Sequence, residues 1–169
     1  MRWLIGFAAL AVLAVTVLSL YVRLAPLDGR GAHVSPYAVS APETPNWALA
    51  APADGAPTTA PRTHDAPVFD GVSEDEIAAR VDRILTQEMG AERVVAERYG
   101  PRPWNTYLVR SPLMGFPDFV TVLTADLEDG RTSVLIYSRS VYGRSDLGAN
   151  AERVERLIER LRAGDGVAG

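Results

Sequence analysis

Charged and hydroxyl-bearing side chains concentrate in residues 137–150, between the last predicted strand and the last predicted helix. A connection of this kind points backbone N–H groups at whatever lies beyond the helix N-terminus, which favours an anion there. Two arginines in the stretch could bind a carboxylate or phosphate through paired hydrogen bonds. The pattern predicts an anion site with the candidate residues Arg139, Ser140, Tyr142, Arg144, Ser145, Asp146 and Asn150.

The same residues also have a purely structural interpretation, which the sequence leaves open. Asp146 can pair with an arginine, and Asn150 is a favourable N-cap for the helix that follows. Gly143 and Gly148 permit tight backbone turns. In this interpretation the polar stretch only closes the fold.

Missing residue types exclude several kinds of chemistry. None of the 169 residues is Cys, which rules out disulfides, a Cys nucleophile and thiolate metal sites. All 17 basic residues are Arg, so the chain has neither a phosphate-loop lysine nor a Schiff-base lysine. His33 and His64 fall in a proline-rich stretch, and we interpret them as solvated residues without the partners that a metal needs. We expect no metal and no cofactor.

Charge patterning argues against a nucleic-acid partner. The net charge is -4, and acidic residues alternate with arginines along the predicted helices instead of forming a basic stripe.

Two segments have the apolar periodicity of amphipathic helices. Ser73 and Glu76 have the spacing of a capping box, which predicts a helix from there to Gly90. The second predicted helix covers residues 151–162. Segments rich in β-branched and aromatic residues predict strands over residues 93–99, 106–111, 119–127 and 132–140.

These elements predict an α+β fold with a small antiparallel sheet of about four strands packed with two helices. Asp129-Gly130 is typical of a tight hairpin turn, so the last two strands should pair antiparallel.

The N-terminus has a long apolar segment. Residues 3–22 carry no charge and lie between Arg2 and Arg23. As a helix they would span about 30 Å, the thickness of a bilayer core. The alternative is a cleaved signal peptide, whose apolar region is usually about 7–15 residues long. Arg23 and Pro26 surround the best cleavage site, at Ala25, and we therefore predict an uncleaved transmembrane helix.

The predicted domain organisation has four parts: residues 1–24 form the transmembrane anchor, and residues 25–66 form a Pro/Ala-rich linker in which residues 46–50 dock on the domain. Residues 67–163 form the α+β domain, and residues 164–169 form a flexible tail. Basic residues are nearly balanced across the anchor. We place the protein in the inner (cytoplasmic) membrane with its soluble domain in the periplasm.

Several short motifs carry a family resemblance. They are Phe116-Pro117-Asp118 before a strand, then Ser138-Arg139-Ser140, Tyr142-Gly143, Ser145-Asp146-Leu147-Gly148, and Asn150 with Arg153-Val154-Glu155. Over about residues 46–161 the chain resembles the bacterial and plastid family called domain of unknown function 1499. The resemblance implies a small α/β domain, often behind a membrane segment, and no established activity. It marks as motif positions Asp118, Arg139, Ser145, Asp146 and Asn150.

One position departs from the family pattern. Arg144 stands where a second aromatic residue would be more usual, which leaves an aromatic ligand wall in doubt.

Three functions stay open. The first is a non-catalytic binding or assembly module of the cell envelope, attached to the membrane through residues 3–22, whose partner is an anionic small molecule, a lipid headgroup or an envelope protein. The second is a hydrolase that uses Asp118 with Asp146, or one of the three serines Ser138, Ser140 and Ser145. A serine nucleophile needs an adjacent base, and the predicted domain contains no histidine. The third is a structural adaptor whose partner contacts a sheet face or exposed tryptophans.

Overall fold

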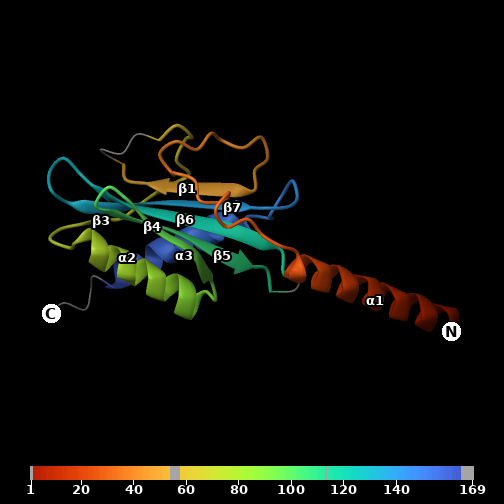
Figure 1. Ribbon diagram of the computed structural model, residues 1–169. Helices are drawn as coiled ribbons and strands as arrows, with labels where there is room; N and C mark the ends of the chain where they lie inside the picture. The colour runs from red at the N-terminus through yellow and green to blue at the C-terminus, as the bar shows by residue number, and fades with distance from the viewer. Residues whose placement is uncertain (1, 54–57, 113, 165–169) are drawn as a thin grey trace.

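The computed structural model describes residues 2–53, 58–112 and 114–164. Its elements are, in chain order, α1 (Arg2–Leu24), β1 (Trp47–Ala51), β2 (His64–Asp65), β3 (Val68–Phe69), α2 (Glu74–Arg83), the π-helical turn η1 (Ile84–Glu88), β4 (Glu92–Tyr99), β5 (Arg102–Arg110), β6 (Pro117–Asp126), β7 (Thr132–Ser140) and α3 (Ala149–Gly164). The strands form one sheet with α2 and α3 packed beneath it, and α1 projects away from one end (Figure 1).

The described residues form a seven-stranded mixed sheet in the order β2-β1-β7-β6-β5-β4, with β3 paired to β7 outside this path. The α+β class is confirmed, but the prediction of a purely antiparallel sheet of about four strands is wrong. β1 and β2 pair in parallel, whereas the other pairings are antiparallel. The extra strands β1, β2 and β3 are short, and they extend the sheet through backbone hydrogen bonds instead of through a strong side-chain pattern.

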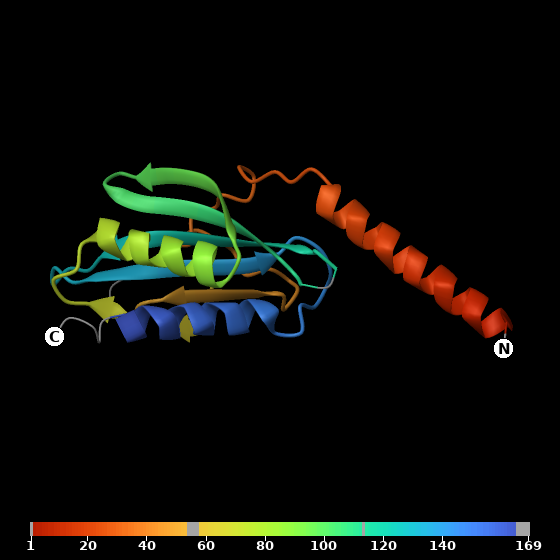
Figure 2. The same ribbon diagram turned by 90° about the horizontal axis from the view of Figure 1, so that it is seen from below.

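The helices cover one face of the sheet, as Figure 2 shows from the helix side. Ser73 Oγ accepts the N–H of Glu76 at 3.3 Å, which confirms the predicted start of α2. The positive φ of Gly90, 66°, follows the end of η1. The core between helices and sheet is made of apolar side chains that include Ile77, Val81, Leu85, Val120, Val122, Ile136, Val154, Leu157 and Leu161.

Residues from the proline-rich stretch cover the opposite face. Ala32 packs with Leu108 and Phe119, and Val39 packs with Leu49 and Tyr137. β1 and β2 come from the same stretch, and β1 pairs with β7 over residues 136–139. Much of the segment expected to be a linker therefore packs on the sheet, while the exact division into linker and domain stays a prediction. Of the predicted tail, Gly164 ends α3 and the rest lies outside the described residues.

Among the described residues, the apolar helix α1 contacts the rest of the protein near its C-terminal end. Ser19 Oγ donates to the carbonyl of Met114 at 3.2 Å, and Arg23 donates to the carbonyl of Pro112 at 3.1 Å. Arg110, at the end of β5, donates to the carbonyl of Val22 at 3.3 Å. Within the part of the chain that the structure describes, residues 6–24 form the one helix long and apolar enough to cross a membrane, a test that an N-terminal signal sequence also passes.

Candidate functional site

A buried polar network lies where the start of β6, the end of β7 and the first turns of α3 meet. Its centre is the Arg153 guanidinium, which donates to Asp118 Oδ2 at 2.7 Å, to Ser138 Oγ at 3.0 Å and to Asn150 Oδ1 at 2.7 Å. Only 11% of the Arg153 side chain and 9% of the Asp118 side chain are exposed. The network thus joins helix and sheet through a charge pair withdrawn from water.

Asn150 connects this pair to the preceding loop and to the proline-rich stretch. Its side-chain amide donates to the carbonyl of Asn46 at 3.0 Å, to Ser140 Oγ at 2.9 Å and to Asp146 Oδ2 at 2.7 Å. Ser138 Oγ donates to Asn150 Oδ1 at 2.6 Å. Asn150 is completely buried, and its polar atoms are occupied by protein groups.

The helix cap is Asp146 and not Asn150. Asp146 accepts the backbone N–H of Gly148 at 3.1 Å and that of Asn150 at 2.8 Å. Burial by itself would raise the pKa of Asp146, but these hydrogen bonds outweigh it and hold the pKa below its ordinary value. Asp146 is therefore an ionised group that closes the N-terminal turn of α3.

The predicted site residues separate into three groups. Asp118, Ser140, Asp146 and Asn150 lie in the network. Tyr142, Arg144 and Ser145 are exposed in the β7–α3 connection, where Ser145 Oγ accepts the N–H of Leu147 at 3.3 Å. Arg139 lies on the opposite face of the sheet, because it alternates along β7 with Ser138 and Ser140. The structure does not bring Arg139 to Asp146.

Sequence reasoning missed Asn46 and Arg153 as site residues, and it considered Ser138 only as a possible hydrolase nucleophile. Arg153 follows Asn150 by three residues, so both side chains project from one face of α3, and this spacing was a usable signal. Ser138 could have been grouped with Ser140 by strand alternation. For Asn46 no local pattern exists, because its contacts are separated from it by about a hundred residues.

On the opposite face, Arg139 lines a pocket of about 440 Å³. The lining also includes the hydroxyl-bearing residues Ser35, Ser40 and Tyr137, together with Val34, Ala38, Val39 and Pro42. Arg139 Nε is buried and has no hydrogen-bond partner among the described residues. Burial raises the pKa of Tyr137, and the nearby positive charge of Arg139 opposes this rise. An N–H donor that is shielded from water without a partner is a costly arrangement, which an acceptor that reached Arg139 Nε would relieve.

The interpretation of His33 as a solvated residue is wrong. Its side chain is 6% exposed, its ring stacks on Trp104 with centroids 3.8 Å apart, and Nδ1 lies 2.7 Å from Thr106 Oγ1. Burial lowers the pKa of His33, against the raising effect of Glu97, whose carboxylate lies 3.7 Å from Nε2. The argument that the domain lacks a histidine therefore fails, although Thr106 is fully buried and cannot meet a substrate.

Two of the three serines proposed for hydrolysis are held in the polar network, and the third, Ser145, accepts the N–H of Leu147. Ser138 and Ser140 are bonded to Asn150, and the partners of His33 and His64 are the threonines Thr106 and Thr63. Over the described residues, no group of three or more His, Asp or Glu side chains could hold a metal ion.

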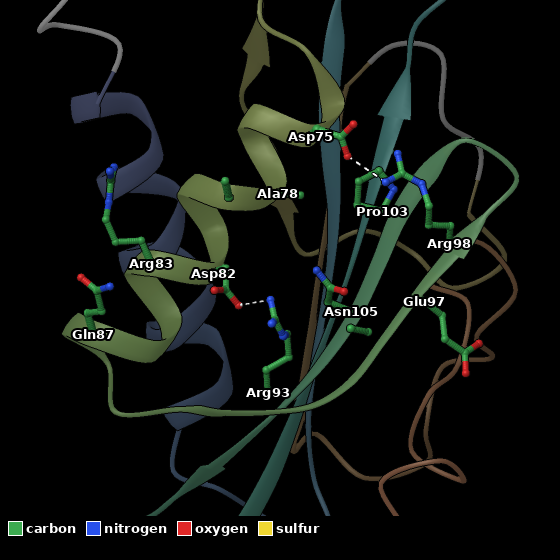
Figure 3. Close-up of a pocket in the computed structure, with 12 residues that line it drawn as sticks. Asp75, Ala78, Asp82, Arg83, Gln87, Arg93, Glu97, Arg98, Pro103 and Asn105 are labelled. Atoms are coloured by element: carbon green, nitrogen blue, oxygen red, sulfur yellow. Dashed lines mark hydrogen bonds and ion pairs between the residues drawn. The ribbon is translucent and has the colours of Figure 1, made fainter.

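A second hollow is a polar groove of about 590 Å³ between α2 and the β4–β5 hairpin (Figure 3). Arg93 pairs with Asp82 at 3.0 Å, and Arg98 pairs with Asp75 at 2.9 Å. Because these arginines of β4 neutralise the carboxylates of α2, the groove makes a weaker site for a charged ligand than the Arg139 pocket.

Comparison with protein families gives one match. The model of a family described as "Protein of unknown function (DUF1499)" matches residues 38–161, which confirms the resemblance and extends it toward the N-terminus. No curated protein and no solved structure matched the chain.

Proposed function

The chain belongs to the DUF1499 family of proteins of unknown function, and from that premise we propose that it is a membrane-anchored, non-catalytic binding module of the cell envelope that holds an anionic ligand at Arg139. The anchor is α1, which is long and apolar enough to cross a membrane. We place the domain on the periplasmic side of the inner membrane.

The observation that carries the binding proposal is the buried Nε of Arg139, which has no hydrogen-bond partner among the described residues. A guanidinium has five N–H donors and recognises carboxylate or phosphate groups. Ser35, Ser40 and Tyr137 offer further hydroxyl donors in the same pocket. The apolar residues of the lining suit a ligand that combines an anionic group with a hydrocarbon part.

The family-motif residues fall into two groups, one that stabilises the fold and one that recognises a ligand. Asn150 donates directly to Asp146, and Arg153 links Asn150 to Asp118, so these three motif residues stabilise the fold instead of meeting a ligand. Of the five motif residues, the network leaves out Arg139 and Ser145, and Arg139 is the one whose side chain has a buried donor without a partner among the described residues. We therefore assign recognition to Arg139 and the architecture of the β7–α3 connection to the network.

Phosphate binding to the full chain in detergent micelles tests the proposal, with thermal unfolding as the readout. Inorganic phosphate should raise the Tm of the wild type, because a ligand that binds only the folded state stabilises it. Chloride at matched ionic strength is the salt control. Arg144→Leu removes an exposed arginine of the β7–α3 connection, outside the Arg139 pocket, and should leave the phosphate response intact.

Arg139→Leu should abolish the response to phosphate. If Arg139→Leu responds as the wild type does, the anion does not bind at Arg139. If chloride raises the Tm of the wild type as much as phosphate does, the effect is general screening and the proposal fails.

A further inference from the structure

Four large apolar side chains are exposed at one end of the domain: Phe116 (38% exposed), Val141 (39%), Tyr142 (48%) and Leu147 (97%). Phe116 belongs to the β5–β6 connection, and the other three belong to the β7–α3 connection. We call these four residues the apolar edge. The buried network explains the fold of this region but gives no reason for bulky apolar side chains in water.

The apolar edge lies at the end of the sheet from which α1 leaves. The N–H of Val141 donates to the carbonyl of Pro117 at 3.1 Å, which places the two connections side by side. The β5–β6 connection in turn bonds to α1 through Ser19 and Arg23. Figures 1 and 2 show both connections at this end in two perpendicular views.

The end of α1 fits closely against the β5–β6 connection. Gly115 has φ 74°, and a Cβ added to it would lie 2.5 Å from Arg23 Cγ. The carbonyl of Gly115 also accepts from Arg110 at 3.1 Å. A larger side chain at Gly115 would require Arg23 to move, so the β5–β6 connection lies in close contact with the last turn of α1.

We propose that the apolar edge inserts into the lipid surface of the bilayer that α1 spans, an inference that rests on the anchoring part of the proposed function. A spanning helix whose last turns bond to the β5–β6 connection brings that connection, and its neighbour, to the membrane interface. Tyr142 suits this depth because its ring is apolar and its hydroxyl is polar. Arg144, exposed in the same connection, and Arg23 can reach lipid phosphates.

The residues of the network hold this edge in place. Asp146, directly before Leu147, accepts the N–H groups of Gly148 and Asn150, which follow Leu147, and so closes the turn that presents Leu147. Leu147 itself has φ 55°, a conformation that leucine rarely adopts. The network therefore fixes the outward position of residue 147, and contact with lipid is the reason for an apolar side chain there.

Depth-dependent fluorescence quenching tests the insertion, and the absence of cysteine from the chain allows a single label at each chosen position. The full chain is reconstituted into phosphatidylcholine–phosphatidylglycerol vesicles with a polarity-sensitive fluorophore on Leu147→Cys. A label on Glu128→Cys, in the exposed hairpin at the other end of the sheet, is the matched control. A label on Val12→Cys reports on α1 itself.

The label at 147 should be quenched by lipids that carry a nitroxide near the headgroup, at a depth of about 5–10 Å. The label at 128 should not be quenched, and the label at 12 should be quenched by a nitroxide deep in the acyl chains. Tyr142→Cys gives a second position in case the label at 147 disturbs the connection, and it should behave as 147 does.

If the label at 12 is quenched while the labels at 142 and 147 match 128, α1 is an anchor but the apolar edge does not meet lipid. That result would overturn the insertion and leave the anchor in place, and the edge would then be free for a protein partner. If no label is quenched, the anchor and the insertion both fail.

Discussion

Arg153 on α3 and Asp118 at the start of β6 form a buried ion pair with a nitrogen–oxygen distance of 2.7 Å. The pair crosses from the helix layer to the sheet, and Ser138 and Asn150 use the remaining contacts of the same guanidinium. Because the charges compensate each other away from water, loss of either partner should cost far more than loss of a surface pair.

Arg153→Met is expected to lower the free energy of unfolding by about 3–5 kcal/mol, because it leaves the Asp118 carboxylate buried without a counter-charge. Arg156→Met is the matched control: Arg156 pairs with Glu152 on the exposed side of α3, and its loss should cost less than about 0.5 kcal/mol. Urea unfolding of the full chain in micelles measures both. Equal losses for the two variants would mean that the buried pair has no special role.

Asp146→Ala should lower the free energy of unfolding by about 0.5–2 kcal/mol, the usual cost of a lost helix cap. The pKa of Asp146 is lowered in the folded state, so its contribution is present above the unfolded value of 3.8 and is lost as the pH falls through the lower folded value. The difference between wild type and variant should therefore be constant near neutral pH and shrink below about pH 4. A difference that grew on acidification would contradict the ionised cap.

His33 gives an acid sensitivity of a different origin. Burial lowers its pKa in the folded state below 6.5, so the unfolded chain takes up protons first as the pH falls. Stability should be constant above about pH 7 and decline below it until the pH reaches the folded value. The negative charge of Glu97 opposes this lowering of the pKa, and the positive charge of Arg30 reinforces it.

His33→Gln should flatten the decline, since glutamine does not titrate and can still bond to Thr106. The midpoint of urea unfolding, measured from about pH 5 to 8, compares the slopes of wild type and variant. Parallel slopes would show that other groups cause the acid sensitivity. His64→Gln is the control at the second histidine, which is less enclosed.

Elements with a strong local pattern were predictable from the sequence. The capping box at Ser73, the apolar stripe of α2 and the Asp129-Gly130 turn each act through neighbouring residues, and the structure contains all three. The predicted strand over residues 132–140 has the observed bounds of β7. β5 begins at Arg102, earlier than the predicted residue 106. Its early part includes Pro103, which pairs with Arg98 of the edge strand β4.

Apart from the expectation that residues 46–50 dock on the domain, contacts over long sequence distances were not predictable, and neither was the strand that these residues form. Ala48, Ala50 and Ala51 are small residues in a proline-rich stretch, and only the free edge of β7 makes them a strand. His33 carried no sign of burial, because its partners Trp104 and Thr106 lie about 70 residues away. The placement of Arg139 and Ser138 on opposite faces of the sheet was predictable, because side chains alternate along any strand.

Arg139→Leu should leave the free energy of unfolding within about 0.5 kcal/mol of wild type, or raise it, in the absence of ligand. The change removes a buried donor that has no partner among the described residues and adds apolar contact with Val34 and Val39. The contrast with Arg153→Met, measured in the same urea experiment, separates a recognition arginine from a structural one. A loss of more than about 2 kcal/mol would identify Arg139 as structural.

Leu147 has φ 55°, and its side chain is almost fully exposed. Asn adopts this left-handed conformation more readily than other residues that carry a Cβ. Leu147→Ala removes the apolar side chain but keeps the backbone strain. The free energy of unfolding of Leu147→Asn should therefore be higher than that of Leu147→Ala by about 0.5–1 kcal/mol. Both variants lose the same lipid contact, and their difference in urea unfolding therefore isolates the strain in the backbone. If Asn were no more stable than Ala, the backbone at Leu147 would store no strain, and the network around Asp146 would not be forcing the leucine outward.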